Sequence, residues 1–156
     1  MTGNLTVNGA PLLIDFDPEE TLLDALRSAG FTEVKRGCEQ GECGACLVLL
    51  DDLLVNSCQV FAATAVGGRV TTTAGLTGEP GVPHPIHEAY AATGAVQCGF
   101  CTPGMVMATF ALLSGNPDPS DDEIREALAG NLCRCTGYVK IVEAVHLAAG
   151  RMRDDG

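Results

Sequence analysis

The chain has 156 residues, a formal net charge of −11, only 4% aromatic residues and no tryptophan. This acidity argues against nucleic acid and anionic membrane surfaces as partners, and the scarcity of aromatic side chains argues against a base-stacking platform. Eight cysteines are too few for a disulfide scaffold in a chain of this length. With no recognisable signal peptide or membrane-spanning apolar run, we expect a cytoplasmic protein without membrane insertion, where cysteine clusters indicate metal or redox chemistry.

A hairpin and a helix are predicted at the start of the chain. Asn8–Gly9 is a strong two-residue turn signal between the apolar runs Leu5–Val7 and Leu12–Phe16. Thr21 is suited to cap the helix that follows, and Gly30 is suited to end it. The opening therefore reads as strand, strand, helix.

A second hairpin is predicted where the apolar run Ala45–Leu50 turns at Asp51–Asp52 into Leu53–Val55. The β-branched run Val70–Thr73 predicts a last strand. Strands wrapped about one helix predict an α+β unit of the β-grasp kind over residues 1–76.

The rest of the chain is predicted to be helical. Residues 77–85 contain three prolines and two glycines and predict a linker. Four helices are expected in residues 86–156: one begins at Pro85 and ends near Gly94, one has Thr102 as N-cap, one follows the capping box Ser120–Glu123, and one follows Thr136. Helices of this length predict a small four-helix bundle.

Four cysteines of the N-terminal unit have the spacing C-x4-C-x2-C-x11-C; they are Cys38, Cys43, Cys46 and Cys58. The first three follow the plant-type ferredoxin spacing for a [2Fe–2S] cluster, in which the fourth ligand is distant in sequence. The chain must loop tightly to bring four thiolates to two irons. Glycines within this loop permit positive φ angles and allow backbone N–H groups to approach the sulfurs.

A second set lies in the helical region and has the pattern C-x2-C…C-x1-C; its members are Cys98, Cys101, Cys133 and Cys135. Each pair is followed directly by a predicted helix start, whose free N–H groups and dipole can stabilise an anionic cluster. The pattern predicts a second metal centre between the halves of the bundle. A structural zinc site is an alternative, although a C-x1-C pair is cramped for tetrahedral ligation.

Together these motifs resemble the small iron–sulfur subunit of the xanthine oxidase family of molybdenum hydroxylases. The resemblance rests on Cys38–Cys46 with Cys58, on Gln97–Gly104 and on Asn131–Tyr138, and it covers nearly the whole chain. It implies a plant-ferredoxin-like domain followed by a helical domain, each with one [2Fe–2S] cluster held by its four cysteines. By the same resemblance, Gln97 would hydrogen-bond a molybdopterin, expected in its cytosine dinucleotide form, and Cys135 would be the ligand closest to that pterin. Thr102 and Arg134 would steady the second cluster by hydrogen bonds.

The implied function is electron transfer within a molybdenum-dependent oxidoreductase. Electrons would pass from molybdenum on a large subunit, through the two clusters, to FAD on a medium subunit, in a dimer of heterotrimers. The chain itself would carry no catalytic residue. Two alternatives stay open: a free-standing two-cluster ferredoxin that serves unrelated partners, and a zinc-stabilised interaction module.

Overall fold

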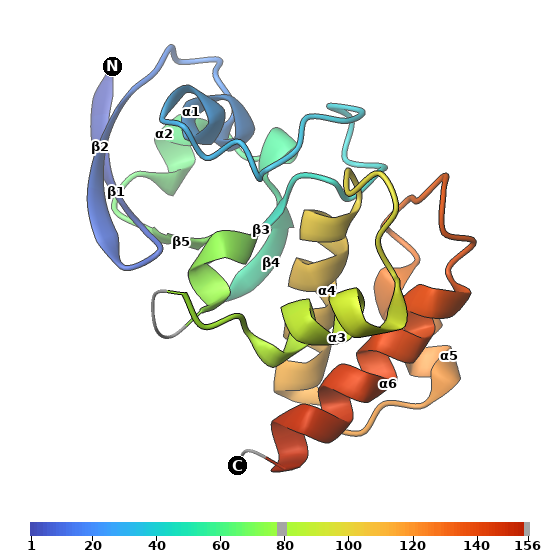
Figure 1. Cartoon of the computed structure of the whole chain (residues 1–156). Coiled ribbons are helices and arrows are strands. Elements are labelled where there is room, and N and C mark those ends of the chain that lie inside the picture. The colour runs from blue at the N-terminus through green and yellow to red at the C-terminus, as the bar shows by residue number, and fades with distance from the viewer. Residues whose placement is uncertain (78–80, 155–156) are drawn as a thin grey trace.

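The computed structural model describes residues 1–77 and 81–154, which form a sheet-containing half and a helical half (Figure 1). This arrangement confirms the predicted α+β class. Residues 78–80 of the predicted linker and residues 155–156 of the predicted helical domain lie outside the described residues. None of the helices in the described ranges is long and apolar enough to cross a membrane.

Within the described residues, five strands form one sheet in the order β2-β1-β5-β3-β4. They are β1 (Thr2–Val7), β2 (Ala10–Asp15), β3 (Leu47–Leu50), β4 (Leu53–Asn56) and β5 (Arg69–Thr71). The β1–β5 pair is parallel and the other neighbouring pairs are antiparallel. Both predicted hairpins are confirmed. Asn8 and Gly9 have φ angles of 51° and 81°, and Asp51 and Asp52 have φ angles of 48° and 68°, as tight two-residue hairpin turns require.

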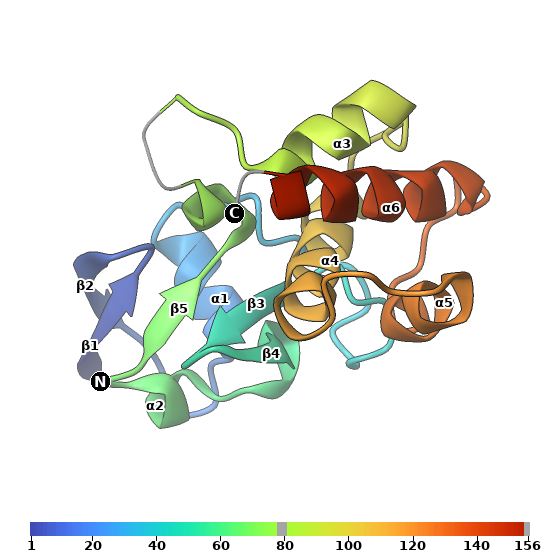
Figure 2. The same cartoon turned by 90° about the horizontal axis from the view of Figure 1, so that it is seen from below.

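Helix α1 (Leu22–Ser28) packs against this sheet, as the β-grasp prediction requires (Figure 2). The Thr21 hydroxyl accepts the Asp24 N–H at 3.2 Å, and the Asp24 carboxylate accepts the Thr21 N–H at 3.3 Å. This reciprocal capping box fixes the first turn. Leu22 and Leu26 are fully buried in a core that they share with residues of β1, β3 and β5.

The last strand differs from the prediction of Val70–Thr73. It ends at Thr71, because the N–H of Thr72 donates to the Asn8 side-chain oxygen at 2.9 Å instead of to a strand. The chain then turns into the 3₁₀ helix η2 (Thr73–Leu76). Two further short elements, η1 (Ser57–Gln59) and α2 (Ala62–Ala65), were not predicted, since three or four residues carry no periodic signal.

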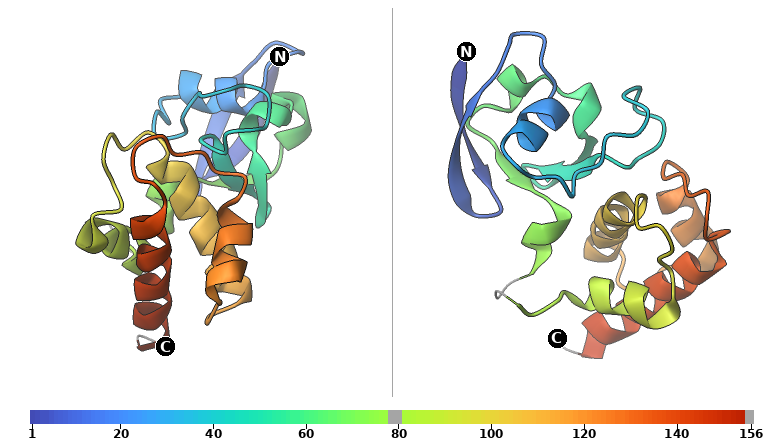
Figure 3. Two further views of the ribbon diagram at one scale, coloured as in Figure 1. Left: turned by 90° about the vertical axis from the view of Figure 1, so that its right-hand side faces the viewer. Right: turned by 45° about the horizontal axis from the view of Figure 1, so that its top comes forward.

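The four predicted helices of the second half are confirmed. They are α3 (Pro85–Thr93), α4 (Thr102–Gly115), α5 (Asp121–Leu128) and α6 (Val139–Asp154). Helix α4 lies between the sheet and the other helices (Figures 2 and 3). Leu49 of β3 and Leu76 of η2 are buried in the helical core, so the two halves pack directly against each other.

The starts of two helices need comment. The N-cap of α4 is Cys101 and not Thr102 as predicted; Cys101 has φ −77° and ψ −19°, and Thr102 is already helical. Helix α6 follows Thr136, as predicted, but begins only at Val139, because Gly137 and Tyr138 have φ angles of 65° and 69° and cannot be part of a helix. The two cysteine pairs therefore do not sit at equivalent helix starts.

Candidate iron–sulfur centres

The first cysteine set lies on the loop between α1 and β3 and on η1. The Cys38 sulfur accepts backbone N–H groups from Gln40, Glu42 and Cys43, each at 3.4 Å. The Gln40 N–H is the largest of the influences that lower the Cys38 pKa to about 7. A sulfur surrounded by N–H donors is suited to carry the negative charge of a metal-bound thiolate.

Cys46 and Cys58 of this set are buried. Gln59 donates its amide to the Cys58 sulfur at 3.5 Å. Burial, with a smaller influence of the Cys58 thiol, raises the pKa of Cys46 to about 11. As a free thiol Cys46 would hold its proton, whereas metal binding would remove that proton.

The second set lies on the segment before α4 and on the loop before α6. The sulfurs of Cys98 and Cys135 are 3.6 Å apart, and both residues are exposed. Cys101 is buried, and burial raises its pKa to about 12. For Cys133, burial opposes ionisation, but hydrogen bonds from the Thr136 hydroxyl at 3.1 Å and the Thr136 N–H at 3.5 Å lower its pKa to about 7.

The thiols of each set influence one another's pKa. In the first set the pKa of Cys38 responds to Cys43 and that of Cys46 to Cys58, and in the second set the Cys98 thiol acts on the pKa of both Cys101 and Cys135. Four cysteines near one another are what a [2Fe–2S] cluster needs. Within residues 1–77 and 81–154, no three His, Cys, Asp or Glu side chains are close enough to hold a single metal ion.

A buried hydroxyl next to the second set supports the fit of a cluster. The Thr102 Oγ1 atom, one residue after Cys101, is buried and has no hydrogen-bond partner among the described residues. Buried polar groups in proteins are nearly always paired. A cluster held by Cys101 would provide sulfur acceptors beside this hydroxyl.

The residues expected to meet a pterin lie at an exposed edge. Gln97 is exposed and precedes Cys98, whose sulfur contacts that of Cys135, so Gln97 and Cys135 open on the same part of the surface. Two apolar side chains close in sequence to these cysteines are also exposed, with exposed fractions of 47% for Phe100 and 57% for Leu132. Arg134 is exposed.

Sequence reasoning missed Gln59 and Thr136 as donors to cysteine sulfurs. The available signal was the position of each residue, directly after a cysteine in the sequence. This position alone does not predict a hydrogen bond, because the loop conformation determines whether the side chain turns toward a sulfur.

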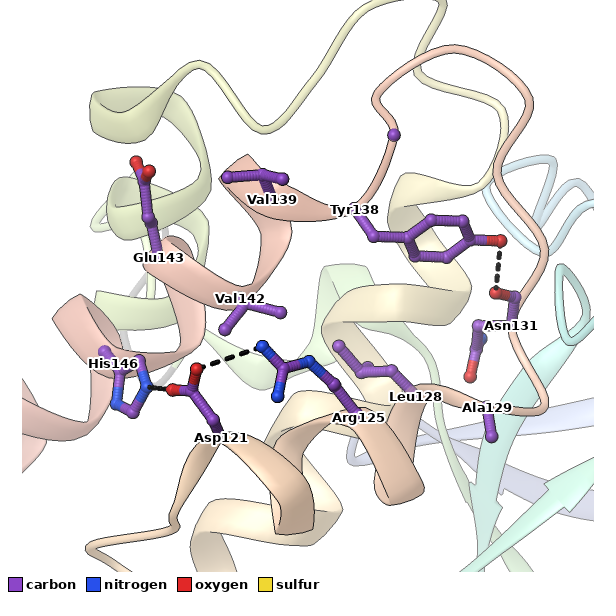
Figure 4. Close-up of a pocket in the computed structure, with 11 residues that line it drawn as sticks. Asp121, Arg125, Leu128, Ala129, Asn131, Tyr138, Val139, Val142, Glu143 and His146 are labelled. Atoms are coloured by element: carbon purple, nitrogen blue, oxygen red, sulfur yellow. Dashed lines mark hydrogen bonds and ion pairs between the residues drawn. The ribbon is translucent and has the colours of Figure 1, made fainter.

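A groove of about 540 Å³ lies between α5 and α6, beside the second cysteine loop (Figure 4). The Asp121 carboxylate there is 2.6 Å from His146 Nε2 and 3.1 Å from the Arg125 guanidinium. Asp121 thus bonds Arg125 within α5 and His146 across to α6. Asn131, Gly137 and Tyr138 of the second cysteine loop line one end of the groove, but no cysteine does.

Comparison with known families divides the chain in two. Residues 5–68 match the 2Fe-2S iron-sulfur cluster binding domain, and residues 72–146 match the [2Fe-2S] binding domain. The nicotinate dehydrogenase small FeS subunit of Eubacterium barkeri is 47% identical over 97% of this chain and 96% of the relative. The xanthine dehydrogenase iron-sulfur-binding subunit of Escherichia coli O157:H7 is 46% identical over 93% of this chain and 92% of the relative.

Solved structures agree. Quinoline 2-oxidoreductase from Pseudomonas putida 86 contains a chain with a TM-score of 0.94 and 40% identity, covering 99% of this chain and 96% of that one. Aldehyde oxidoreductase from Desulfovibrio gigas matches with a TM-score of 0.91 and 41% identity over 100% of this chain, but over 18% of its own, longer chain. The chain therefore belongs to the small [2Fe–2S] subunits of the xanthine oxidase family of molybdenum hydroxylases, and its role is electron transfer within such an oxidoreductase complex.

Proposed function

We propose that each cysteine set holds one [2Fe–2S] cluster, which when bound accepts and releases single electrons. The first set is Cys38, Cys43, Cys46 and Cys58, and the second is Cys98, Cys101, Cys133 and Cys135. The observation that carries this proposal is that one cysteine set falls within each of the two matched [2Fe–2S] binding domains, residues 5–68 and residues 72–146.

The protein contributes charge stabilisation at both sites. Three backbone N–H groups around Cys38, the Gln59 amide at Cys58 and the Thr136 hydroxyl at Cys133 all donate toward sulfur. Such donors stabilise the more negative, reduced state and so tune the potential. Because the three donors at Cys38 belong to the backbone, they need little rearrangement when an electron arrives.

We further propose a division of labour among subunits. A large subunit would hold molybdopterin, in the cytosine dinucleotide form, and a medium subunit would hold FAD, with two such heterotrimers forming a dimer. The support is that relatives of nearly equal length carry the names small subunit or iron-sulfur-binding subunit. We place the complex in the cytoplasm, since eight thiols that bind iron require a reducing compartment.

The second cysteine set would face the pterin. Gln97 would donate a hydrogen bond to it, and Cys135 would be the nearest ligand cysteine, because both residues are exposed at one edge. The exposed apolar side chains of Phe100 and Leu132, each next to a cysteine of the second set in sequence, suit contact with a protein partner. The first set would then face the FAD subunit.

The proposed domain division is 1–76 for the ferredoxin-like domain, 77–85 for the linker and 86–156 for the helical domain. Separate hydrophobic cores in the two halves support it, as does the change from one family match to the other between residues 68 and 72. Leu76, the last residue of the proposed ferredoxin-like domain, packs in the core of the helical half.

The test is purification of the chain with its partner subunits, followed by metal analysis of variants. Gln97→Ala is expected to lower the molybdenum content of the complex while iron stays at about four per copy of this chain. Gln40→Ala is the matched control, because Gln40 is also exposed and lies in the other cysteine loop. Unchanged molybdenum content and turnover in Gln97→Ala would reject the role of Gln97.

A further inference from the structure

The two cysteine loops touch directly through their backbones. The Leu132 N–H donates to the carbonyl oxygen of Cys43 at 2.9 Å. Beside this bond, the Asn131 side-chain amide donates to the carbonyl of Gly44 at 3.2 Å. Because Leu132 precedes Cys133, one hydrogen bond connects a cysteine of the first set to the immediate neighbour of a cysteine of the second.

Asn131 is the centre of this contact. Its side chain is buried, and the residue is 3% exposed. The Tyr138 hydroxyl donates to the Asn131 carbonyl at 3.2 Å (Figure 4). The same hydroxyl accepts the Cys133 N–H at 2.8 Å. One tyrosine hydroxyl thus closes the segment from Asn131 to Tyr138 into a compact loop that carries Cys133 and Cys135.

The backbone of Tyr138 is in the left-handed region, with φ 69°. A bulky residue is seldom found there unless its surroundings hold it. The two hydrogen bonds of its hydroxyl provide that hold. Breaking them frees the loop to relax toward an unstrained conformation.

The first cysteine loop packs closely against the start of α4. A Cβ atom on Gly104, in the first turn of α4, would collide with the Gly44 carbonyl and approach the Asn131 amide. Three segments therefore meet at the Asn131 side chain: the first cysteine loop, the start of α4 after Cys101, and the second cysteine loop. Their separation is set by direct backbone contact.

We infer that Asn131 and Tyr138 are positioning residues for electron transfer between the two centres. They hold the Leu132 N–H against the Cys43 carbonyl, so that a hydrogen bond connects the two cysteine loops. One electron leaves one centre and arrives at the other, with no bond made or broken and no proton required. The inference rests on the proposed cluster ligands.

The test uses the full chain, purified anaerobically with its iron. Tyr138→Phe removes only the hydroxyl, and Asn131→Ala removes the amide. Tyr90→Phe is the matched control, because Tyr90 is the other tyrosine of the chain and its hydroxyl bonds Thr109 at 2.9 Å inside the helical core. Iron and sulfide content, hydrogen exchange of the peptide containing Leu132, and the magnetic interaction between the two reduced centres are measured for each protein.

Both variants are expected to keep about four irons per chain, while exchange at Leu132 rises about tenfold and the magnetic interaction weakens. Tyr90→Phe should match the unmodified chain in all three measurements. Unchanged exchange and interaction in both variants would overturn the inference, and so would loss of the second cluster in Tyr138→Phe, since that would indicate a role in cluster binding itself. An unmodified chain without two clusters would instead refute the proposed function.

Discussion

The hydroxyl of Thr136 lies 3.1 Å from the sulfur of Cys133 and donates a hydrogen bond to it. Thr136→Val keeps the shape of the side chain and removes this donor. Because the donor stabilises the reduced state, we expect the potential of one centre to fall by roughly 20–60 mV, the one-electron equivalent of a hydrogen bond of about 0.5–1.5 kcal/mol.

A redox titration followed by paramagnetic resonance measures this change. Thr64→Val is the control, because the exposed Thr64 hydroxyl bonds the Phe61 carbonyl away from either cysteine set. Equal potentials in Thr136→Val and the unmodified protein would show that this hydroxyl does not tune the centre.

Gly104 and Gly115 lie at opposite ends of α4 and should respond differently to alanine. At Gly104 a Cβ would meet the Gly44 backbone, whereas at Gly115 nothing lies within 4 Å. We expect Gly104→Ala to lower the thermal midpoint of the iron-loaded protein by roughly 2–10 °C, the effect of about 1–3 kcal/mol of overpacking. Gly115→Ala should leave it unchanged or slightly higher. Equal midpoints for the two variants would contradict the close packing of the cysteine loop on α4.

Stability should decrease in mild acid through His84. Burial, together with the nearby His87, holds the pKa of His84 below its usual value, and its Nδ1 atom accepts the Ile86 N–H at 3.2 Å at the start of α3. The unfolded chain takes up the proton near the ordinary histidine pKa, so the folded state loses stability as the pH falls through about 6.5.

His84→Asn keeps a helix-capping acceptor and removes the titration. The variant should therefore lose less thermal stability than the unmodified chain between about pH 7.5 and about pH 5.5, at equal iron content. Parallel pH profiles of the two proteins would mean that His84 protonation has no part in the loss.

Substitution of one cysteine from each set separates the two centres. Cys43→Ser and Cys101→Ser should each reduce the iron content from about four to about two per chain and remove one of two paramagnetic signals. The signal that is lost should differ between the two variants. Loss of both signals in either variant would show that the two sites cannot be filled independently.

Local sequence signals predicted the parts of this fold that depend on neighbouring residues. Both hairpins follow from residues that tolerate positive φ, at Asn8–Gly9 and Asp51–Asp52. The capping boxes at Thr21 and Ser120 follow from side chains three residues apart. The cysteine sets were recognisable for the same reason, since most of the cysteines in each set lie within a few residues of another member.

Contacts between the halves were not predictable. The Asn131–Gly44 hydrogen bond joins residues 87 apart, and neither residue carries a local sign of its partner. The late start of α6 depends on the left-handed conformation of Tyr138, which only its long-range surroundings enforce. The N-cap of α4 moved from Thr102 to Cys101, because a cysteine at an N-cap resembles no common capping signal.

Metal analysis of the full chain, prepared anaerobically with ample iron, decides whether the eight cysteines hold two [2Fe–2S] clusters. We expect about four irons and about four acid-labile sulfides per chain, with two distinct paramagnetic signals after reduction. A colourless protein that contains zinc in place of iron would contradict it.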